Sequence, residues 1–414
     1  MEIPMKNKAI KYLSLLLVSR IVLMLSACGK QAAEFDPNSD YDSIVGQAKG
    51  QTVTFYGWGG NEANNRWIDT VLAPAVQEKY EITLKRVPMD IEQVMAKLVG
   101  EKQAGKESGS IDMIWINGEN FYSAKENDLL FGPVTGYLPN FSKYVDAEAD
   151  NIRSDYGYPT DGYESPYGNN QMVLITDSAK ISETPKNAAE FLDFAKAHPG
   201  RVTYPALPDF TGRTFVVNLI YNLVGYEQFQ TMEAQKETVR EAIEPALDYL
   251  RELNPYLWNQ GKTFPATSAQ VDTMFADGEL DLTMSCYPYT YLAEVEKGTF
   301  PATVHSFIFE NGMAADTDFI AVAANSPHKA GALVVMNEVL SPEMQAARLD
   351  IAKICPAIDN TRMEPEEQKL FENAMPSGGG TIPLEELNEK KLPQMPAKLV
   401  PIIEEIWLEE VVGK

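Results

Sequence analysis

Beyond the first fifty residues, short apolar segments alternate with longer segments whose apolar residues recur at helical spacing. Segments 52–57, 82–88 and 111–116 are rich in β-branched, aromatic or other large apolar residues, and we expect them to be strands. Segments 61–80 and 90–102 place their apolar residues on one face and are predicted to be helices. Because strands and amphipathic helices alternate in this way in βαβ units, the pattern predicts a doubly wound α/β lobe.

The same alternation starts again further along the chain and predicts a second α/β lobe. Strands are expected at 171–178 and 201–205, with a helix between them at 187–200. A helix that leads into a strand is predicted over 271–286. The passage 155–170 is polar and rich in Gly, Tyr and Pro, so we expect it to carry the chain from one lobe to the other.

The first 27 residues have the organisation of a secretory signal peptide. A head with three lysines precedes a mostly apolar run, 12–25, and two small residues follow it. The run contains Arg20 and is shorter than the roughly 20 residues that span a bilayer, so a membrane-spanning helix is not expected. The sequence "LSAC" resembles a bacterial lipoprotein box, which predicts lipidation of Cys28. An incidental cysteine in an N-terminal helix is the alternative.

The segment that follows the signal peptide is polar and rich in small residues. It covers residues 28–50 and is predicted to be a flexible spacer between the lipid and the folded body. Signal peptide and Cys28 together predict a protein that is lipid-anchored to the cell membrane on its extracytoplasmic face.

Composition narrows the class of function. The chain of 414 residues has a net charge of −24, so it has no electrostatic reason to bind nucleic acid or anionic lipid. A hydrophobic content of 44% indicates a globular protein that is long enough for two domains. Cys286 and Cys355 are the cysteines beyond Cys28, and either a disulfide or two buried thiols fits their spacing.

Loops that follow the predicted strands carry the candidate binding residues, because ligands of open α/β sheets bind beyond the carboxyl ends of the strands. These loops are rich in Gly, Asn, Tyr and Trp, which offer backbone amides, directional hydrogen bonds and ring faces. Ordinary turn chemistry is the alternative for each loop taken alone. The candidates are Trp58, Gly59, Gly60, Asn61, Asn117, Glu119, Tyr167, Asn169, Asp209, Thr211, Arg213, Tyr287 and Tyr289.

Catalytic and metal-binding motifs are absent from the sequence. His198, His305 and His328 are isolated from other ligand residues, and no nucleotide-binding glycine motif or G-x-S-x-G motif occurs. We therefore expect no metal, no cofactor and no enzyme activity. The alternative is a surface-tethered, glycosidase-like hydrolase that would use two carboxylates of a cleft, drawn from Glu119, Glu164 and Asp209.

Four stretches resemble a known family. "FYGWGGNEANNRWID", "IDMIWINGENF", "GYESPYGNNQ" and "YPALPDFTGRTF" are similar to signature runs in the YnjB-like branch of the extracellular solute-binding proteins of bacterial ABC importers, and the likeness spans residues 52–349. It implies a type II periplasmic-binding-protein fold, in which a hinge joins two lobes and the ligand lies in the cleft between them. It also implies a monomer that delivers its ligand to an ABC permease powered by an ATPase. Distant relatives bind thiamine, polyamines, iron or sugars.

The resemblance also implies domain boundaries. Lobe 1 is expected at 51–165 and 302–345, and lobe 2 at 166–301 and 346–414. The segment 303–323 is the candidate for the return of the chain to lobe 1.

The ligand is predicted from the residue types in the candidate loops. Rings of Trp58, Tyr167, Tyr287 and Tyr289, together with the acids Glu119 and Asp209, favour a small organic cation that is thiamine-like or an amine. An anion held by glycine amides and Arg213, or a sugar stacked on Trp58, are the competing ligands. The further alternative is that the rings pack in the cores of the lobes and contact no ligand.

Overall fold

A computed structural model describes residues 35–375 and 380–413 of the chain. By its internal contacts the chain divides into a short unit that ends at Ser39 and a large unit, Asp40–Lys414, which we call the body. The helices and sheets of the described residues belong to the body. The predicted signal peptide and Cys28 lie outside the described residues.

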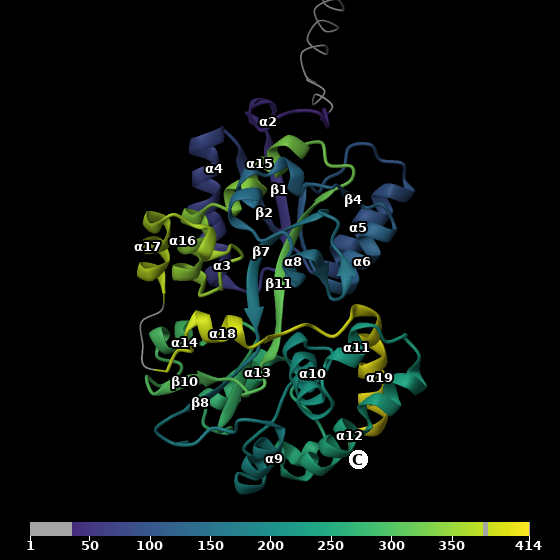
Figure 1. Cartoon of the computed structure of the whole chain (residues 1–414), viewed down its shortest axis with the longest axis vertical. Coiled ribbons are helices and arrows are strands. Elements are labelled where there is room, and N and C mark those ends of the chain that lie inside the picture. Colours follow the sequence, from purple (N-terminus) through teal and green to yellow (C-terminus); the bar gives the residue numbers. More distant parts are fainter. Residues whose placement is uncertain (1–34, 376–379, 414) are drawn as a thin grey trace, which may run out of the picture. The chain divides into compact units, whose positions relative to one another are not determined.

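The segment that was predicted to be a flexible spacer is in part helical, which corrects the prediction. Helix α2 (Tyr41–Ala48) begins after Asp40, whose side chain accepts a hydrogen bond from the backbone N–H of Ser43. The helix packs against α15 (Lys329–Val339), and its Ile44 is fully buried (Figure 1). Its stripe of buried residues is too narrow to stand out in a polar sequence, so the packing and not the pattern reveals the helix.

The first sheet joins three parallel strands to a long strand that runs antiparallel to them. Strand β1 (Thr52–Gly57) lies between β2 (Thr83–Pro88) and β3 (Met113–Ile116), and these three predicted strands run parallel. Strand β11 (Met313–Ala323) pairs antiparallel with β3. Three further strands pair with β11, and they are β4 (Leu130–Phe131), β7 (Glu164–Gln171) and β12 (Lys391–Leu392).

Helices cover the first sheet because one face of each is apolar. Val94 and Leu98 of α5 (Ile91–Gln103) and Phe121 of α6 (Gly118–Glu126) are buried together with Ile114 of β3. Each such side chain contributes about 1.5–3 kcal/mol by its burial. Asn61 caps the first helix by accepting a hydrogen bond from the backbone of residue 64. The helices on this side are α3 (Glu62–Trp67), the π-helical turn η1 (Ile68–Leu72), α4 (Ala73–Tyr80), α5 (Ile91–Gln103), α6 (Gly118–Glu126), α7 (Pro139–Tyr144), α8 (Asp150–Arg153), α15, α16 (Pro342–Ala352) and α17 (Pro365–Ala374).

The second sheet is antiparallel, which differs from the doubly wound lobe that the sequence predicts. Strand β8 (Val173–Asp177) lies in the middle and pairs antiparallel with β9 (Leu282–Ser285) and β10 (Val304–Phe307). A short apolar strand has the same residue pattern in a parallel sheet as in an antiparallel one, so the pattern did not predict which of the two forms. The helices on this side are α9 (Ala188–Ala197), α10 (Phe210–Val224), α11 (Glu227–Gln230), α12 (Lys236–Leu253), α13 (Ser268–Ala276), α14 (Tyr291–Lys297), α18 (Leu384–Glu389) and α19 (Val400–Glu410).

Residues 201–205, predicted to form a strand, are extended but pair with no strand of the described chain. The carbonyls of Arg201 and Val202 accept hydrogen bonds from the backbone of Asp281 and Trp258. Pro205 has no N–H to donate, so the segment could not continue a ladder. Tyr204 is nevertheless fully buried, and it accepts a hydrogen bond from the indole of Trp407.

Two long strands connect the sheets. β7 and β11 lie side by side and pair antiparallel from Glu164 and Ala321 at one end to Gln171 and Ala315 at the other (Figure 1). The chain enters β8 directly after β7, and it reaches β11 from β10, so both strands lead from one sheet to the other. Strand β7 coincides with the end of the predicted crossing, 155–170, and β11 lies in the segment predicted for the return of the chain, 303–323.

Contacts correct two of the predicted lobe boundaries. Strand β10 falls in predicted lobe 1, but it pairs with β8 in the second sheet. Residues 346–374 fall in predicted lobe 2, but α16 packs against α3 and α17. The buried guanidinium of Arg348 explains the second difference, since its Nε donates to Asn64 of α3 at 3.0 Å. A cation without that partner would be costly to bury, so α16 belongs with the first sheet.

Candidate functional site

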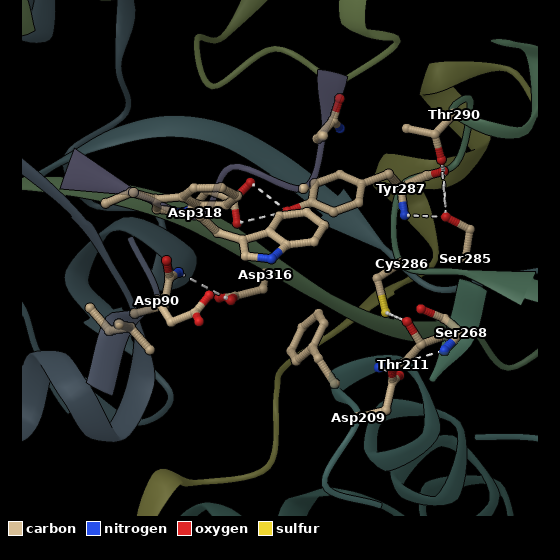
Figure 2. Close-up of a pocket in the computed structure, with 18 of the residues that line it drawn as sticks. Asp90, Asp209, Thr211, Ser268, Ser285, Cys286, Tyr287, Thr290, Asp316 and Asp318 are labelled. Carbon is tan, nitrogen blue, oxygen red and sulfur yellow. Dashed lines mark hydrogen bonds between the residues drawn. The ribbon is translucent and has the colours of Figure 1, made fainter. Parts of the chain in front are cut away.

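A cavity of about 800 Å³, which we call the interlobe cavity, is lined by residues from both sides of the crossing strands. Figure 2 shows Asp90, Asp316 and Asp318 facing Asp209 and Thr211 across it. The predicted site residues that line it are Trp58, Gly60, Asn61, Asn117, Glu119, Asp209, Thr211, Arg213 and Tyr287. The loops that follow β1 and β3 therefore meet the loops of the second sheet, as the sequence predicts.

Four predicted residues lie outside this lining. The rings of Tyr167 and Tyr289 are fully buried, and their hydroxyls bond to Asn64 and to the carbonyl of Ile382. These two rings therefore pack in the cores of the lobes, which is the alternative given for them above. Asn169 donates to the carbonyl of Pro356, and the carbonyl of Gly59 accepts from Asn65.

Asp209 holds two helices in position at the wall of the cavity. One carboxylate oxygen accepts from the backbone N–H of Thr211 at 2.8 Å and so caps α10, and the other accepts from Ser268 at 2.9 Å. The thiol of Cys286 lies against the Thr211 hydroxyl, with 3.9 Å between sulfur and oxygen (Figure 2). Cys286 and Cys355 are both free and buried, so they form no disulfide.

Arg213 is a base of the cavity wall, and its charge is already balanced. Its guanidinium lies 3.9 Å from Glu119 and 3.4 Å from Glu404. Burial opposes its charge, but Tyr156, Glu119 and Glu404 outweigh that effect and raise the pKa of Arg213. The residue therefore stays cationic and ties α6 of the first side to α19 of the second.

Asp318 lies on β11 and lines the cavity, and it was not predicted from the sequence. Its carboxylate accepts from the hydroxyl of Tyr287 at 3.2 Å (Figure 2). It also accepts from the amide of Asn170 at 3.3 Å. Burial raises the pKa of Asp318 to about 6, although Arg348 opposes the rise. The register of β11 against β7 shifts between Asp318 and Phe319, a bulge of the kind that re-aims side chains beside binding sites.

Asp316 adds a second carboxylate on the same strand. It is two residues from Asp318, a spacing that puts both side chains on one face of a strand, and both line the cavity. Burial, and then the charges of Asp155 and Asp318, raise the pKa of Asp316 well above its ordinary value. The sequence signal was present as "DTD" in an apolar strand, but spacing alone does not show burial.

Tyr156 reaches the cavity from the tip of a two-stranded hairpin, β5 (Ser154–Asp155) and β6 (Tyr158–Pro159). Tyr156 and Gly157 both have positive φ, 47° and 76°, which is the conformation of the tight turn that joins such strands. Tyrosine adopts it at a cost of about 1 kcal/mol or more. Asp155 fixes the hairpin by accepting from the backbone N–H of Gly118 at 2.6 Å.

Comparison with known proteins gives the family. Residues 72–372 match the family model described as "Bacterial extracellular solute-binding protein". Over 316 residues the chain is 37% identical to Protein YnjB of Escherichia coli strain K12, which covers 76% of this chain and 81% of that protein. The chain belongs to the bacterial extracellular solute-binding proteins.

Solved structures share the fold of this solute-binding protein. PotD, the spermidine/putrescine ABC transporter substrate-binding protein of Streptococcus pneumoniae, is 14% identical with a TM-score of 0.63, covering 87% of this chain and 98% of that one. Iron-bound HitA of Pseudomonas aeruginosa is 20% identical with a TM-score of 0.56, covering 88% and 99%. AfuA of Actinobacillus pleuropneumoniae, with fructose-6-phosphate bound, is 13% identical with a TM-score of 0.58, covering 87% and 98%.

The family defines what this solute-binding protein does in outline. It is an extracellular solute-binding protein and therefore acts outside the cytoplasm. Proteins of this class bind a small ligand and interact with a permease and an ATPase. Among the described residues, no helix is both long and apolar enough to cross a membrane.

The hydrolase alternative is not supported. The family that matches is one of solute-binding proteins and not of enzymes. Of the three carboxylates considered for catalysis, Glu119 and Asp209 line the interlobe cavity, whereas Glu164 lines a different one. Asp209 also has both oxygens engaged by backbone N–H groups. Within 35–375 and 380–413, no group of His, Cys, Asp and Glu is arranged to hold a metal ion.

Proposed function

We propose that this solute-binding protein captures a small organic cation, thiamine-like or a simple amine, in the interlobe cavity. The observation that carries the proposal is the excess of carboxylates over bases around that cavity. The acids that line it are Glu62, Asp90, Glu92, Glu119, Asp209, Asp272, Glu294, Asp316 and Asp318, and the lining bases are Arg213 and Lys297.

Both bases are already paired within the protein. Arg213 lies between Glu119 and Glu404, and the ammonium of Lys297 lies 2.8 Å from Glu294. Neither is therefore available as the main partner of an anionic ligand. Carboxylates that remain without a cation raise the local negative potential, and a cationic ligand offsets the cost of keeping them dehydrated.

Aromatic rings add a second attraction for a cation. Trp58, Trp115, Tyr156 and Tyr287 line the same cavity as the acids, and a desolvated cation gains about 0.5–2 kcal/mol over each ring face that it meets. The mixture of rings and carboxylates suits an organic ammonium better than a hydrated inorganic ion.

An anion is the less favoured ligand. The helix that follows "GWGGN" begins with Glu62, and its N-terminal cap is the side chain of Asn61. A carboxylate in the first turn already occupies the favourable end of the helix dipole, which would otherwise attract an anion. A neutral sugar stacked on Trp58 remains an outcome of the test, and the names of the structural neighbours, which include spermidine/putrescine, fructose-6-phosphate and iron, do not decide among these classes.

Calorimetry on the purified protein tests the proposal with a panel of thiamine, putrescine, spermidine, phosphate esters and sugars at pH 7.5. We expect a cation to bind and Asp318→Asn to weaken it at least tenfold, which corresponds to about 1.4 kcal/mol. Asp128→Asn is the matched control, because its side chain is 91% exposed and lies outside the cavity. Binding of an anion or a sugar, with no cation bound, would reject the proposal.

The affinity for the cation should also depend on pH. Burial raises the pKa of Asp318 and of Asp272 to about 6, and a cation binds the deprotonated carboxylates. Affinity is therefore expected to be full above pH 7 and to fall as the pH drops through 6, and this fall should be smaller in Asp318→Asn.

We also infer the setting in which the protein works. It is a monomer that is held to the cell membrane through a lipid on Cys28 and passes its ligand to the permease of an ABC importer. The "LSAC" sequence supports the anchor, and the family supports the importer.

A further inference from the structure

A second cavity, of about 920 Å³, borders the β5–β6 hairpin, and we call it the hairpin cavity. Residues of segment 135–164 line it together with α11, the start of β11 and residues 391–394. It shares only Tyr156 and Asp316 with the interlobe cavity. The two cavities are therefore neighbours separated by these two side chains, and the hairpin cavity has its own set of polar groups.

Glu164 is the unusual group in this lining. Glu164 is 2% exposed and lines the hairpin cavity, and neither of its carboxylate oxygens has a hydrogen-bond partner among the described residues. Buried polar groups are nearly always hydrogen-bonded, and a buried charge without a partner is costly. Arg153 and Lys391 also line the cavity, but neither pairs with Glu164 within the described chain.

Asp112 shows how the same chain satisfies a carboxylate that is equally buried. It is also 2% exposed, and it accepts hydrogen bonds from Thr54, Ser326 and His328. These bonds outweigh burial and lower the pKa of Asp112. Within the described residues no donor bonds to Glu164. Burial, and then the neighbouring acids Asp155 and Asp316, raise the pKa of Glu164 well above its ordinary value, although Lys125 opposes the rise. The difference between the two residues indicates that the partner of Glu164 lies outside the described residues.

The neighbouring acids define the charge of that partner. One oxygen of Asp155 also has no hydrogen-bond partner among the described residues, and Asp316 lines the same cavity as Glu164. Three acids in one region favour a cation. These carboxylates are not arranged to hold a metal ion, since no such group occurs in the described chain. A primary ammonium fits better, because it needs a single buried carboxylate as its acceptor, whereas a metal ion needs several ligands that converge.

The lining of the hairpin cavity also contains a hydrogen-bond donor, the side-chain amide of Gln394. Gln394 is 7% exposed, lines the hairpin cavity, and its side-chain nitrogen has no partner within the described residues. The backbone N–H of Ala397 donates to the carbonyl of Tyr156 at 3.0 Å, which holds this segment against the hairpin. A ligand that satisfies Gln394 must offer an acceptor oxygen. Phe141, Ile152 and Tyr226 add apolar surface to the same wall.

We propose that the hairpin cavity is a second ligand site, separate from the cargo site, which binds a small primary amine carrying a hydroxyl or carbonyl oxygen. The ammonium binds Glu164, the carboxylate of Asp316 in the same lining makes the potential there more negative, and the oxygen of the ligand accepts from the amide of Gln394. Because Asp316 also lines the interlobe cavity, occupation of one site changes the charge that the other site meets.

The test uses linear amino alcohols with two to six carbons and the n-alkylamines of the same lengths. Each is titrated at pH 8 into the purified protein and into the variants Glu164→Gln, Gln394→Met and Asp318→Asn, with calorimetry as the readout. We expect one amino alcohol to bind at least tenfold tighter than its alkylamine, and this preference should disappear in Gln394→Met. Glu164→Gln should weaken binding at least tenfold, whereas Asp318→Asn, a variant of the cargo site, should change it less than threefold.

Three results would overturn the proposal. They are no binding at 20 mM for any member of the series, equal binding by Glu164→Gln, and loss of binding in Asp318→Asn alone, which would assign the amine to the interlobe cavity. Circular dichroism and melting curves check that each variant is folded. The cargo proposal is judged separately by the ligand panel, so either proposal can fail without the other.

Discussion

Glu164 is a residue whose charge should lower the stability of the folded protein when no ligand is present. Burial raises its pKa, so the folded chain keeps a proton that the unfolded chain releases. Stability is then highest at low pH and falls as the pH rises from the unfolded pKa toward the folded one. We expect Glu164→Gln to raise the free energy of unfolding at pH 8 by about 1–3 kcal/mol.

Thermal melts at several pH values measure this effect. The advantage of Glu164→Gln should shrink as the pH approaches 5, where the native carboxyl holds its proton. Asp128→Asn replaces an exposed acid and should stay within about 0.5 kcal/mol of the native protein at every pH. A destabilised Glu164→Gln at pH 8 would show that an unseen partner, rather than burial, governs this carboxylate.

Single residues also show what the sequence could predict about the site. Trp58, Asn117 and Tyr287 follow strands, and the rule that ligands bind beyond strand ends found them. Asp318 lies within an apolar strand, where only the three-dimensional pairing of β7 with β11 shows that it faces a cavity. Tyr167 looks like a ring in a loop, but it faces the core, since side chains alternate between the two faces of a strand.

Helix α2 makes a prediction at the level of an element. If it is an integral part of the body, Ile44→Ala should destabilise the protein by about 2–5 kcal/mol, as expected for a fully buried isoleucine. Gly46→Ala is the matched control in the same helix, because a methyl group there meets no atom within 4 Å. It should stabilise the helix by about 0.5–1 kcal/mol. Denaturant unfolding measures both, and an Ile44→Ala variant as stable as the native protein would make α2 a dispensable segment.

The elements also divide into those that pattern could predict and those that it could not. The parallel strands β1, β2 and β3 alternate with helices along the chain. This alternation appears as a change of apolar spacing between neighbouring segments, so the sequence alone could predict it. The antiparallel pairing of β8 with β9 joins residues more than 100 positions apart, so no local pattern encodes it. The place of α16 likewise depends on a hydrogen bond between Arg348 and Asn64, far apart in the chain.

For the whole molecule we expect closure of the lobes around the bound ligand. Residues from both sides line the interlobe cavity, so a ligand that contacts both selects the closed arrangement by its differential affinity. Small-angle scattering should show a smaller radius of gyration with the cation that calorimetry identifies. The same cation should leave the radius of Asp318→Asn unchanged at concentrations that saturate only the native protein. An unchanged radius at saturation of the native protein would count against hinge closure.

Anchoring is the second prediction for the whole molecule. Cys28→Ser removes the thiol that would carry the lipid, so the variant should move from the membrane fraction to the soluble fraction of the cells. Mass spectrometry of the native protein should find a chain that begins at a lipid-modified Cys28. Equal membrane binding by the variant, with residues 1–27 still removed, would contradict the anchor.

The exposure of Trp58 has an optical consequence. Its indole is 54% exposed at the interlobe cavity, whereas those of Trp67 and Trp407 are buried in the protein. Water relaxes around an exposed excited indole and shifts its emission to longer wavelengths. A solute that covers this ring should shift the emission to the blue. Trp58→Phe should reduce the shift to what Trp115, the less exposed indole of the same lining, contributes. The protein therefore contains its own fluorescent reporter of occupancy.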